Sequence, residues 1–529
     1  MRHLRRALTG LIITVLGLSS LMAPLPAHAA SGYNLTGVAS GGRTTTSATA
    51  IKLTVRFTKN GKAVRKATAL LQYAKGTAWV TEKKVAVRSG KGSVKVKHGV
   101  GDRTYRFAVK GAPASASFVV HFVPATFTVA GSGRGHGVGM SQYGAYQLAR
   151  GKGWSAGQIL EYYYSGATVG TANYNTRTVK VQVLGPPTDS RTATSLSISS
   201  GGFSVTDGSS TLAITRAKKP IAIGVSGSRV TAKVTLASGK VRTLTAARLV
   251  FRWSDSATVA VAGAQGSYRY GNLQATVIGK RPNVINEVRM NTEYLYGLDE
   301  MPSSWGSAAG GGQEALKAQV IAARSYVIKQ AAKWNHPDNS PGSNPACDCQ
   351  IFDDSRSQNY TGWKKAGGAG NAYWRRAVDQ TIPSTGTVQI LRTSSAAQSD
   401  IAEALYFASS GSYTAGGITS SGTVSNADAF GTTAIGYLGH VDDPYSVLAP
   451  GNPYRSWTVK MSQAKAKNLF RIGTLRSLTV TSRYPGGQVK VITATSVTGA
   501  TSTLTPRTSE AWRIALGLPG AWVSGITGR

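Results

Sequence analysis

The chain has 529 residues, which is more than one hydrophobic core usually holds, so several domains are expected. Its formal net charge is +38, and this excess favours attraction to a polyanion; the alternative is a charge that serves solubility alone. The sequence has only two cysteines, which excludes a fold held together mainly by disulfides.

The first 29 residues are predicted to be an export signal. Arg2, Arg5 and Arg6 precede an apolar run that ends in Ala27-His28-Ala29, a cleavage pattern of secretory signals. No later run approaches the roughly 18 apolar residues that span a bilayer. We therefore expect a secreted protein, in the cell wall or outside the cell, without a transmembrane anchor. Export makes anionic cell-wall polymers or a phospholipid surface better partners than nucleic acid.

Residues 31–123 are predicted to form an Ig-like β-sandwich. Apolar and polar residues alternate in short runs such as Ile51–Phe57, which is the period of a half-buried strand. Turn signals such as Asn60-Gly61 recur at regular intervals between these runs. The segment resembles bacterial Ig-like modules of cell-surface proteins. Its basic face either binds the wall, or the module is a spacer.

The segment Phe127–Ala145, FTVAGSGRGHGVGMSQYGA, places six glycines around His136 and Gln142. Glycine lets a backbone approach other groups closely, so His136 and Gln142 are predicted to contact a sugar or to brace a catalytic acid. A buried histidine with satisfied hydrogen bonds is the alternative. The spacing of the glycines is not that of a phosphate-binding loop.

Helices are expected at three places in the remainder of the chain. Ser155 and Gln158 form a capping box ahead of a short helix. A helix from Glu314 to about Lys333 follows a β-rich stretch at 171–280 and carries an apolar stripe that includes Leu316. A last helix is expected at SEAWRIALGL near the C-terminus. Strands and helices together predict an α+β fold.

The candidate catalytic residue is Glu300, within YLYGLDEMPSSWG. Cleavage of a glycosidic bond requires an acid that protonates the leaving oxygen. Leu298, Met301 and Trp305 are expected to surround Glu300 with apolar groups, which would raise its carboxyl pKa into the range of a general acid. The alternative is a glutamate that caps the turn at Pro302. Glu314 is explained by its place in the first turn of a helix.

Residues 286–328 resemble the core motif of the stage II sporulation protein D family (SpoIID), also called the amidase-enhancer family. In that family YLYG-x-x-EMP-x-x-W is followed by EALKAQ-x-x-AARSY. Further matches are YFASSGSYT at Tyr406–Thr414, the run Asp442–Tyr445 followed by Trp457, and GHGVGMSQYGA. The usual family order places GHGVGMSQ last, whereas here it precedes the EMP motif. The sequence therefore looks circularly permuted, which a fold tolerates when its original ends lie close together.

The resemblance implies a lytic transglycosylase that cleaves peptidoglycan glycan strands stripped of stem peptides and leaves 1,6-anhydromuramic ends. Such an enzyme needs one acid/base, because the C6 hydroxyl of muramic acid attacks its own anomeric carbon, and Glu300 matches that role. A muramidase that leaves reducing ends is a second enzyme hypothesis. The alternative to an enzyme is a non-catalytic cell-wall-binding protein that activates a partner amidase. No cofactor is required, and a role in sporulation or in vegetative growth stays open.

Five further residues are candidate substrate-binding residues. Gln319 and Arg324 lie off the Leu316 stripe and either face a sugar or lactyl carboxylate or occupy a solvated helix face. Ser409, Ser410 and Tyr413 match the SSGG-Y-T element of the family, although Ser412 replaces its second glycine. Small hydroxyl residues beside a glycine let a backbone approach a glycan, and an ordinary turn is the alternative.

His336, Cys347 and Cys349 are candidate ligands of a structural zinc ion. Some members of the SpoIID family carry zinc on two cysteines and a histidine in this region, although the spacing here departs from common zinc signatures. The competing prediction is a disulfide between Cys347 and Cys349, which suits an exported protein.

These predictions divide the chain into a signal peptide, an Ig-like sandwich and a permuted SpoIID-type domain at 1–29, 31–123 and 124–529. The last is divided further into the GHGVGMSQ segment, a β-rich insertion or subdomain, a catalytic core and a C-terminal β/helix segment, at 124–170, 171–280, 281–460 and 461–529.

Overall fold

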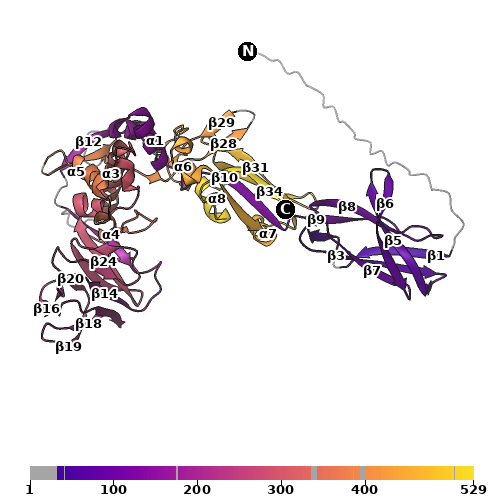
Figure 1. Ribbon diagram of the computed structural model, residues 1–529, viewed down its shortest axis with the longest axis horizontal. Helices are drawn as coiled ribbons and strands as arrows, with labels where there is room; N and C mark the ends of the chain where they lie inside the picture. Colours follow the sequence, from indigo (N-terminus) through magenta and orange to yellow (C-terminus); the bar gives the residue numbers. More distant parts are fainter. Residues whose placement is uncertain are drawn as a thin grey trace, which may run out of the picture. The chain divides into compact units, whose positions relative to one another are not determined.

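The computed structural model describes residues 32–40, 42–173, 177–334, 342–384, 386–393, 400–415, 418–504 and 507–529. The chain separates into two compact units, one up to Ala125 together with Arg529 and one from Thr126 to Gly528 (Figure 1). The first unit contains only strands in its described part, and the second combines strands with helices, as an α+β protein does. The predicted signal peptide lies outside the described residues.

The first unit is a nine-stranded sheet in the order β1-β3-β7-β6-β5-β8-β9-β2, with β4 paired to β3. In β3, Ile51, Leu53, Val55 and Phe57 are buried while Lys52 alternates with them and is exposed, so the predicted alternation is confirmed. The Ig-like sandwich itself stays a prediction. The strands are β1 (Tyr33–Ala39), β2 (Thr44–Thr46), β3 (Ile51–Lys59), β4 (Lys62–Ala63), β5 (Lys66–Lys75), β6 (Ala78–Arg88), β7 (Lys91–Val96), β8 (Gly101–Ala108) and β9 (Phe118–Val123).

The second unit contains the predicted β-rich region, which is built from two sheets. A seven-stranded sheet has the order β16-β15-β20-β23-β24-β13-β25, and a six-stranded sheet has the order β19-β18-β17-β14-β21-β22. They pack together through β17 against β24 and β18 against β23. The strands are β13 (Thr178–Leu184), β14 (Thr194–Ile198), β15 (Ser204–Thr206), β16 (Thr211–Ile214), β17 (Ile221–Ser226), β18 (Arg229–Thr235), β19 (Val241–Ala246), β20 (Leu249–Arg252), β21 (Val259–Val261), β22 (Ser267–Tyr268), β23 (Asn272–Ile278), β24 (Arg281–Arg289) and β25 (Ile351–Phe352).

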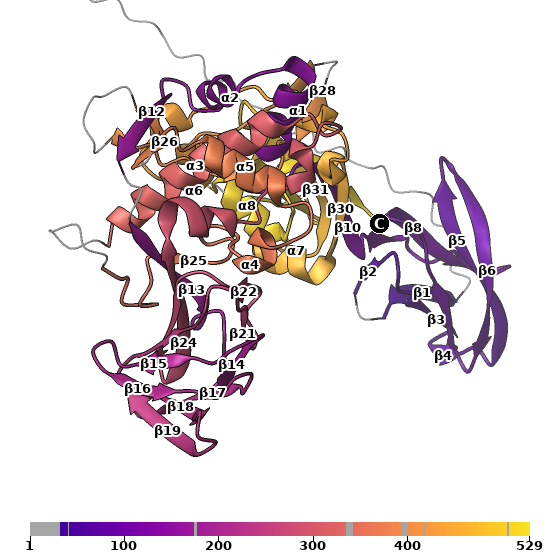
Figure 2. The same ribbon diagram turned by 60° about the vertical axis from the view of Figure 1, so that its left-hand side comes forward.

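A helical layer surrounds α3 (Gln313–Ala332), which packs against α1, α2 and α5 (Figure 2). The predicted helices are confirmed at α3, at α2 with the Ser155–Gln158 capping box, and at α8. The sequence analysis missed the others, including α1, which Ser141 caps and which begins inside the glycine-rich segment. The remaining helices are α1 (Gln142–Lys152), α2 (Ala156–Tyr163), α4 (Trp363–Ala366), α5 (Ala372–Gln380), α6 (Asn426–Phe430), α7 (Gln463–Phe470) and α8 (Ser509–Leu516), with short turns η1 (Met290–Tyr294), η2 (Ser303–Gly306), η4 (Gly436–Leu438), η5 (Ser446–Leu448) and η6 (Pro453–Arg455).

The two ends of the second unit lie side by side. β10 (Thr126–Ser132) pairs with both β30 and β34, and Phe127 in β10 stands opposite Gly528 in β34. Adjacent ends are the condition that a circular permutation requires, while the permutation itself stays a prediction. The remaining strands are β11 (Met140–Ser141), β12 (Thr168–Asn173), β26 (Thr387–Arg392), β27 (Tyr406–Phe407), β28 (Ser412–Ala415), β29 (Ile418–Ser421), β30 (Trp457–Ser462), β31 (Leu475–Arg483), β32 (Val489–Ser496), β33 (Thr501–Thr503) and β34 (Trp522–Gly528).

Candidate functional site

The glycine-rich segment and the YFASSG segment are paired in space. β11 runs parallel to β27, and Arg134 forms an isolated bridge with Ser409. Gly139 has a φ of +74°, and a Cβ placed there would lie 2.0 Å from the carbonyl oxygen of Leu405, so only glycine fits. The two segments are far apart in sequence, but their pairing brings Gln142 and Tyr406 to the same carboxyl group.

That carboxyl group belongs to Glu300, and three donors reach it. The backbone N–H of Asn359 donates to Oε1 at 2.6 Å, and Nε2 of Gln142 lies 3.4 Å from Oε2. The hydroxyl of Tyr406 forms a further hydrogen bond with it. Burial raises the pKa of Glu300 above its ordinary value, although the three hydrogen bonds act against this shift. The carboxyl therefore stays protonated to a higher pH than an exposed glutamate.

A chain of polar groups supports Tyr406 from behind. Nε2 of Gln358 donates to the Tyr406 hydroxyl at 2.8 Å and also to the backbone carbonyl of Ala323. Oε1 of Gln358 accepts from the hydroxyl of Tyr294 at 2.7 Å. These contacts fix the orientation of the Tyr406 hydroxyl toward Glu300, which is how an outer set of residues holds a catalytic group in place.

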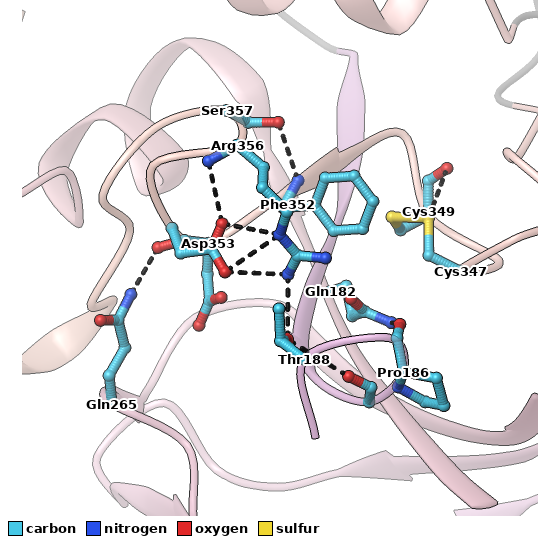
Figure 3. A network of polar contacts seen from close by, with 12 residues as sticks. Gln182, Pro186, Thr188, Gln265, Cys347, Cys349, Phe352, Asp353, Arg356 and Ser357 are labelled. Carbon is cyan, nitrogen blue, oxygen red and sulfur yellow. Dashed lines mark hydrogen bonds and ion pairs between the residues drawn. A yellow bond between two sulfur atoms is a disulfide. The ribbon is translucent and has the colours of Figure 1, made fainter. Parts of the chain in front are cut away.

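The loop that leads to Asn359 is stiffened by its own contacts (Figure 3). Oγ of Ser357 accepts from the backbone N–H of Phe352 at 3.1 Å, and the side-chain amide of Gln265 donates to the backbone carbonyl of Asp353. Arg356 lies over the ring of Phe352, 3.8 Å from its centre. These contacts help to hold the Asn359 amide in position, 2.6 Å from Oε1 of Glu300.

Glu300 opens into a cavity of about 660 Å³. Arg134 also lines it, as does Glu510, which is paired with Arg513 at 2.5 Å. An adjoining cavity of about 420 Å³ shares part of this lining, including Tyr406, whereas Glu300 lines the first cavity only. The residues common to both cavities are His136, Ser355, Ser357, Tyr406 and Glu510.

His136 lines the same cavity, but its ring nitrogens already have partners. Nδ1 accepts from the backbone N–H of Val138 at 3.0 Å, and the ring forms a hydrogen bond with the backbone of Tyr406. Burial lowers the pKa of His136 to about 4, so the ring is neutral near pH 7. The geometry favours a residue that positions the strand of Tyr406, and it leaves the predicted sugar contact without a free nitrogen.

Gln319 and Arg324 lie inside the protein rather than on the cavity wall, and both are fully buried. Oε1 of Gln319 accepts from Gln142 at 3.3 Å, so Gln319 supports the residue that contacts Glu300. Arg324 donates to the carbonyl oxygen of Gln389 at 2.9 Å and to the hydroxyl of Thr381 at 2.9 Å. The solvated helix face proposed as the alternative for both residues is wrong, because both side chains are fully buried.

The predicted contacts from Ser409, Ser410 and Tyr413 are not in this cavity. Ser409 and Ser410 are fully buried, and Oγ of Ser409 accepts from Asn452 at 2.9 Å. The ring of Tyr413 lies beneath the guanidinium of Arg483, 3.3 Å from its carbon atom. In this structure the serines hold the glycine-rich segment, and a direct role of these three residues in substrate binding stays a prediction.

Cys347 and Cys349 are joined by a disulfide (Figure 3). The bond agrees with the competing prediction and leaves neither thiolate available as a zinc ligand. His336 lies outside the described residues, so the zinc set as a whole stays a prediction. Within the described ranges, histidine, cysteine, aspartate and glutamate side chains form no group of three that could hold a metal ion.

The apolar residues predicted around Glu300 lie in different settings. Leu298 and Met301 are buried as predicted, but Trp305 stacks on Tyr146 with ring centres 4.2 Å apart.

The sequence analysis did not single out Tyr406, Gln358 and Asn359. Tyr406 opens a motif that was noted for its serines, whereas Asn359 acts through its backbone amide and leaves no trace in the side-chain pattern. Glu314 accepts from the N-terminus of α2 at the backbone N–H of Ala156, which agrees with a structural role.

Comparison with known proteins gives one family match. Residues 279–385 match the model of the family described as Stage II sporulation protein, SpoIID. No curated protein matches the chain at a significant level. A solved structure similar to part of it is Yersinia pseudotuberculosis adhesin InvE, with 14% identity over 41% of this chain and 59% of that chain, at a TM-score of 0.14. A score this low carries no argument.

The matched range contains Glu300, its apolar neighbours and the loop that donates to it, so the family model and the geometry of the site concern the same part of the molecule. Among the described residues, no helix combines the length and apolar character of a membrane span. The match supports the SpoIID family for this chain and, with it, a function related to the cell wall.

Proposed function

We propose that this protein is an exported lytic transglycosylase that cleaves peptidoglycan glycan strands, with Glu300 as its acid and base. The observation that carries the proposal is the carboxyl group of Glu300, whose pKa burial raises and which three hydrogen-bond donors hold at the wall of a cavity of about 660 Å³. A carboxyl with a raised pKa, fixed in a cavity, is what protonation of a glycosidic oxygen requires.

The reaction uses one carboxyl group twice. Protonated Glu300 gives its proton to the glycosidic oxygen as the bond from this oxygen to the anomeric carbon of muramic acid breaks. The C6 hydroxyl of the same sugar then bonds to the anomeric carbon and returns its proton to Glu300. Between the two steps Glu300 is a carboxylate, which the Asn359 amide, the Tyr406 hydroxyl and the Gln142 amide stabilise.

Positive charge in the cavity supports a substrate that has lost its stem peptides. Removal of the peptide exposes the lactyl carboxylate of muramic acid, so a stripped glycan carries one negative charge at each muramic acid. Arg134 and Arg513 are among the residues that line the cavity of Glu300, and an arginine guanidinium binds carboxylates through two parallel hydrogen bonds. Arg134 comes from the glycine-rich segment and is exposed, whereas Arg513 is already paired with Glu510.

The test is product analysis with the full chain on peptidoglycan, native and stripped of stem peptides. We expect 1,6-anhydromuramic ends by mass spectrometry, mainly from the stripped substrate. Glu300→Gln should abolish them, whereas Glu314→Gln, which changes a structural glutamate in the same matched segment, should retain them. Undiminished product from Glu300→Gln would overturn the role of this residue.

The same experiment separates the alternatives. Reducing ends in place of anhydro ends would indicate a muramidase. Absence of any cleaved glycan, together with stimulation of an amidase that Glu300→Gln leaves unchanged, would favour the non-catalytic activator. Either result would refute the transglycosylase.

A further inference from the structure

The first unit carries basic side chains that stand opposite one another on neighbouring strands. Arg56 in β3 faces Lys91 in β7, Lys91 faces Arg88 in β6, and Arg88 faces Lys66 in β5. One row of four cations therefore crosses four strands. A second row begins with Lys52 in β3 opposite Lys95 in β7. We call this surface the basic face; its members are all exposed and comprise Lys52, Arg56, Lys66, Lys84, Arg88, Lys91 and Lys95.

Among the described residues up to Ala125, neither acidic side chain forms a salt bridge with a member of the basic face. The sequence up to Ala125 contains two, Glu82 and Asp102. Glu82 lies 2.9 Å from His98 and also pairs with Arg103, and Asp102 lies 2.9 Å from His121. Like charges directly opposite each other on a sheet destabilise it. Repulsion between these cations therefore lowers the stability of the folded sheet. An anion that lies across the rows would replace this repulsion by attraction.

The geometry of the rows suits a long anion with repeated charges. Neighbouring strands are about 4.8 Å apart, so a row of four side chains extends over roughly 14 Å. Between the two rows, Thr54 in β3 stands opposite Ser93 in β7, which supplies small polar groups rather than bulk. The face contains both arginine and lysine, and arginine binds phosphate oxygens in pairs while lysine binds them as a point charge.

We propose that the basic face binds an anionic phosphodiester polymer of the cell wall and so retains the protein there. Nucleic acid has the same charged linkage, but single strands are held by aromatic side chains that stack on the bases. The outward positions of β3 between Lys52 and Arg56, of β7 between Lys91 and Lys95, and of β6 between Lys84 and Arg88 are lysine, arginine, threonine, serine and alanine. A chain of sugar alcohols and phosphates needs no such stacking.

This inference is independent of the proposed function, because it concerns the first unit and not the cavity of Glu300. A failure to cleave glycan would leave it untouched, and a failure to bind the polymer would leave the transglycosylase untouched.

The test measures binding of a glycerol-phosphate polymer to the full chain at several salt concentrations. The quadruple variant Arg56→Gln, Lys66→Gln, Arg88→Gln and Lys91→Gln removes the charges of the first row and leaves an uncharged polar side chain at each position. We expect its affinity to fall at least tenfold. The slope of log Kd against log salt should fall by about 3, since each neutralised phosphate contributes about 0.7.

A matched control removes the same number of charges elsewhere in the unit. Arg43, Lys62, Lys75 and Lys110 are exposed and lie outside the basic face, and changing all four to glutamine should cost less than threefold. Lys52→Gln with Lys95→Gln, which removes part of the second row, should give an intermediate loss and serves if the quadruple variant does not fold. Equal losses from the row and the control would overturn the proposal. Tighter binding of single-stranded nucleic acid than of the polymer at matched charge would also overturn it.

Discussion

The two units of this protein use the same excess of lysine and arginine in opposite ways. In the second unit, two cations near the candidate site pair with carboxylates: Lys365 lies 2.9 Å from Asp299, and Arg513 lies 2.5 Å from Glu510. On the basic face of the first unit, cations stand opposite cations. Paired charges fix the walls of a cavity, whereas unpaired charges on an exposed sheet remain available to an anion from solution. The comparison predicts that substitutions near Glu300 change stability and catalysis by altering the geometry of the site. Substitutions on the basic face should change stability and anion binding by altering charge.

The strongest test of the geometric side is Gly139→Ala. The added Cβ would lie 2.0 Å from the carbonyl oxygen of Leu405, at a φ of +74° that alanine disfavours. We expect a loss of about 3 kcal/mol in the free energy of unfolding of the second unit, from backbone strain and the clash together. Denaturant titration of the full chain measures it. Gly153 has a φ of +68° with no atom within 4 Å of the added Cβ, so Gly153→Ala should cost about 1 kcal/mol. Equal losses would show that the approach to Leu405 does not matter.

The next largest effect is expected for Tyr406→Phe on catalysis. The variant removes a hydrogen bond that lowers the pKa of Glu300 and stabilises its carboxylate. We expect kcat to fall about 100-fold, as on loss of one donor to a developing negative charge. The reaction needs protonated Glu300, so activity declines as pH rises through this pKa, and the decline should move to higher pH in the variant. Tyr33→Phe, which changes a tyrosine of β1 in the first unit, is the control and should leave both kcat and the pH profile unchanged. An unshifted profile for Tyr406→Phe would contradict the role given to its hydroxyl.

The local elements could be predicted from the sequence because local forces determine them. The Ser155–Gln158 capping box and the alternation in β3 depend on residues a few positions apart, and both form as expected. The proximity of Gln142 to Glu300 was predicted from the resemblance of the glycine-rich segment and the EMP motif to one family, because no local pattern links residues so distant.

The orientation of α3 could not be predicted in the same way. A single apolar stripe suggested one buried side, with Gln319 and Arg324 on the other. Because α1, α2 and α5 surround α3, the side opposite the stripe is buried as well, and Arg324 meets backbone carbonyls instead of a substrate. Contacts through the backbone, such as the Asn359 amide to Glu300, depend on how a loop folds and not on the identity of its side chain.

Asp353 is an exception to the pairing of charges in the second unit, and it predicts a pH dependence of stability. Burial raises its pKa to about 7, with a further contribution from the charge of Asp354. The folded state then keeps a proton that the unfolded chain releases above about pH 4. The contribution of Asp353 to the free energy of unfolding is therefore fully present below about pH 4, and it is lost as pH rises to about 7.

Asp353→Asn should remove this loss of stability and raise the free energy of unfolding at pH 8 by about 2 kcal/mol. This gain is smaller than the value obtained when the whole pKa shift of Asp353 is converted at about 1.4 kcal/mol per pKa unit. Denaturant titrations at pH 4 and pH 8 measure the change. Asp354→Asn is the control with the opposite sign: although burial raises the pKa of Asp354, its bonds to Arg356 lower it overall. Its loss should therefore destabilise the protein at pH 8. A variant at Asp353 that is no more stable than the parent at pH 8 would be inconsistent with a buried, protonated carboxyl.

The smallest effect tests the other side of the comparison. Lys91→Glu places a carboxylate between Arg56 and Arg88, which both stand opposite position 91. Replacing two like-charge contacts by two opposite-charge contacts should stabilise the first unit by about 0.5 kcal/mol at low salt, and the gain should disappear near 1 M salt, where such interactions are screened within about 3 Å. Lys75→Glu, exposed opposite Ala78 at the end of β5, should leave stability unchanged.

The same Lys91→Glu change should weaken binding of the glycerol-phosphate polymer. We expect greater stability together with weaker binding if the cations of the rows bind an anion and at the same time lower the stability of the first unit. A destabilised variant would mean that the cations of the row do not repel one another. The contrast between paired charges in the second unit and unpaired charges on the basic face would then have no effect on stability.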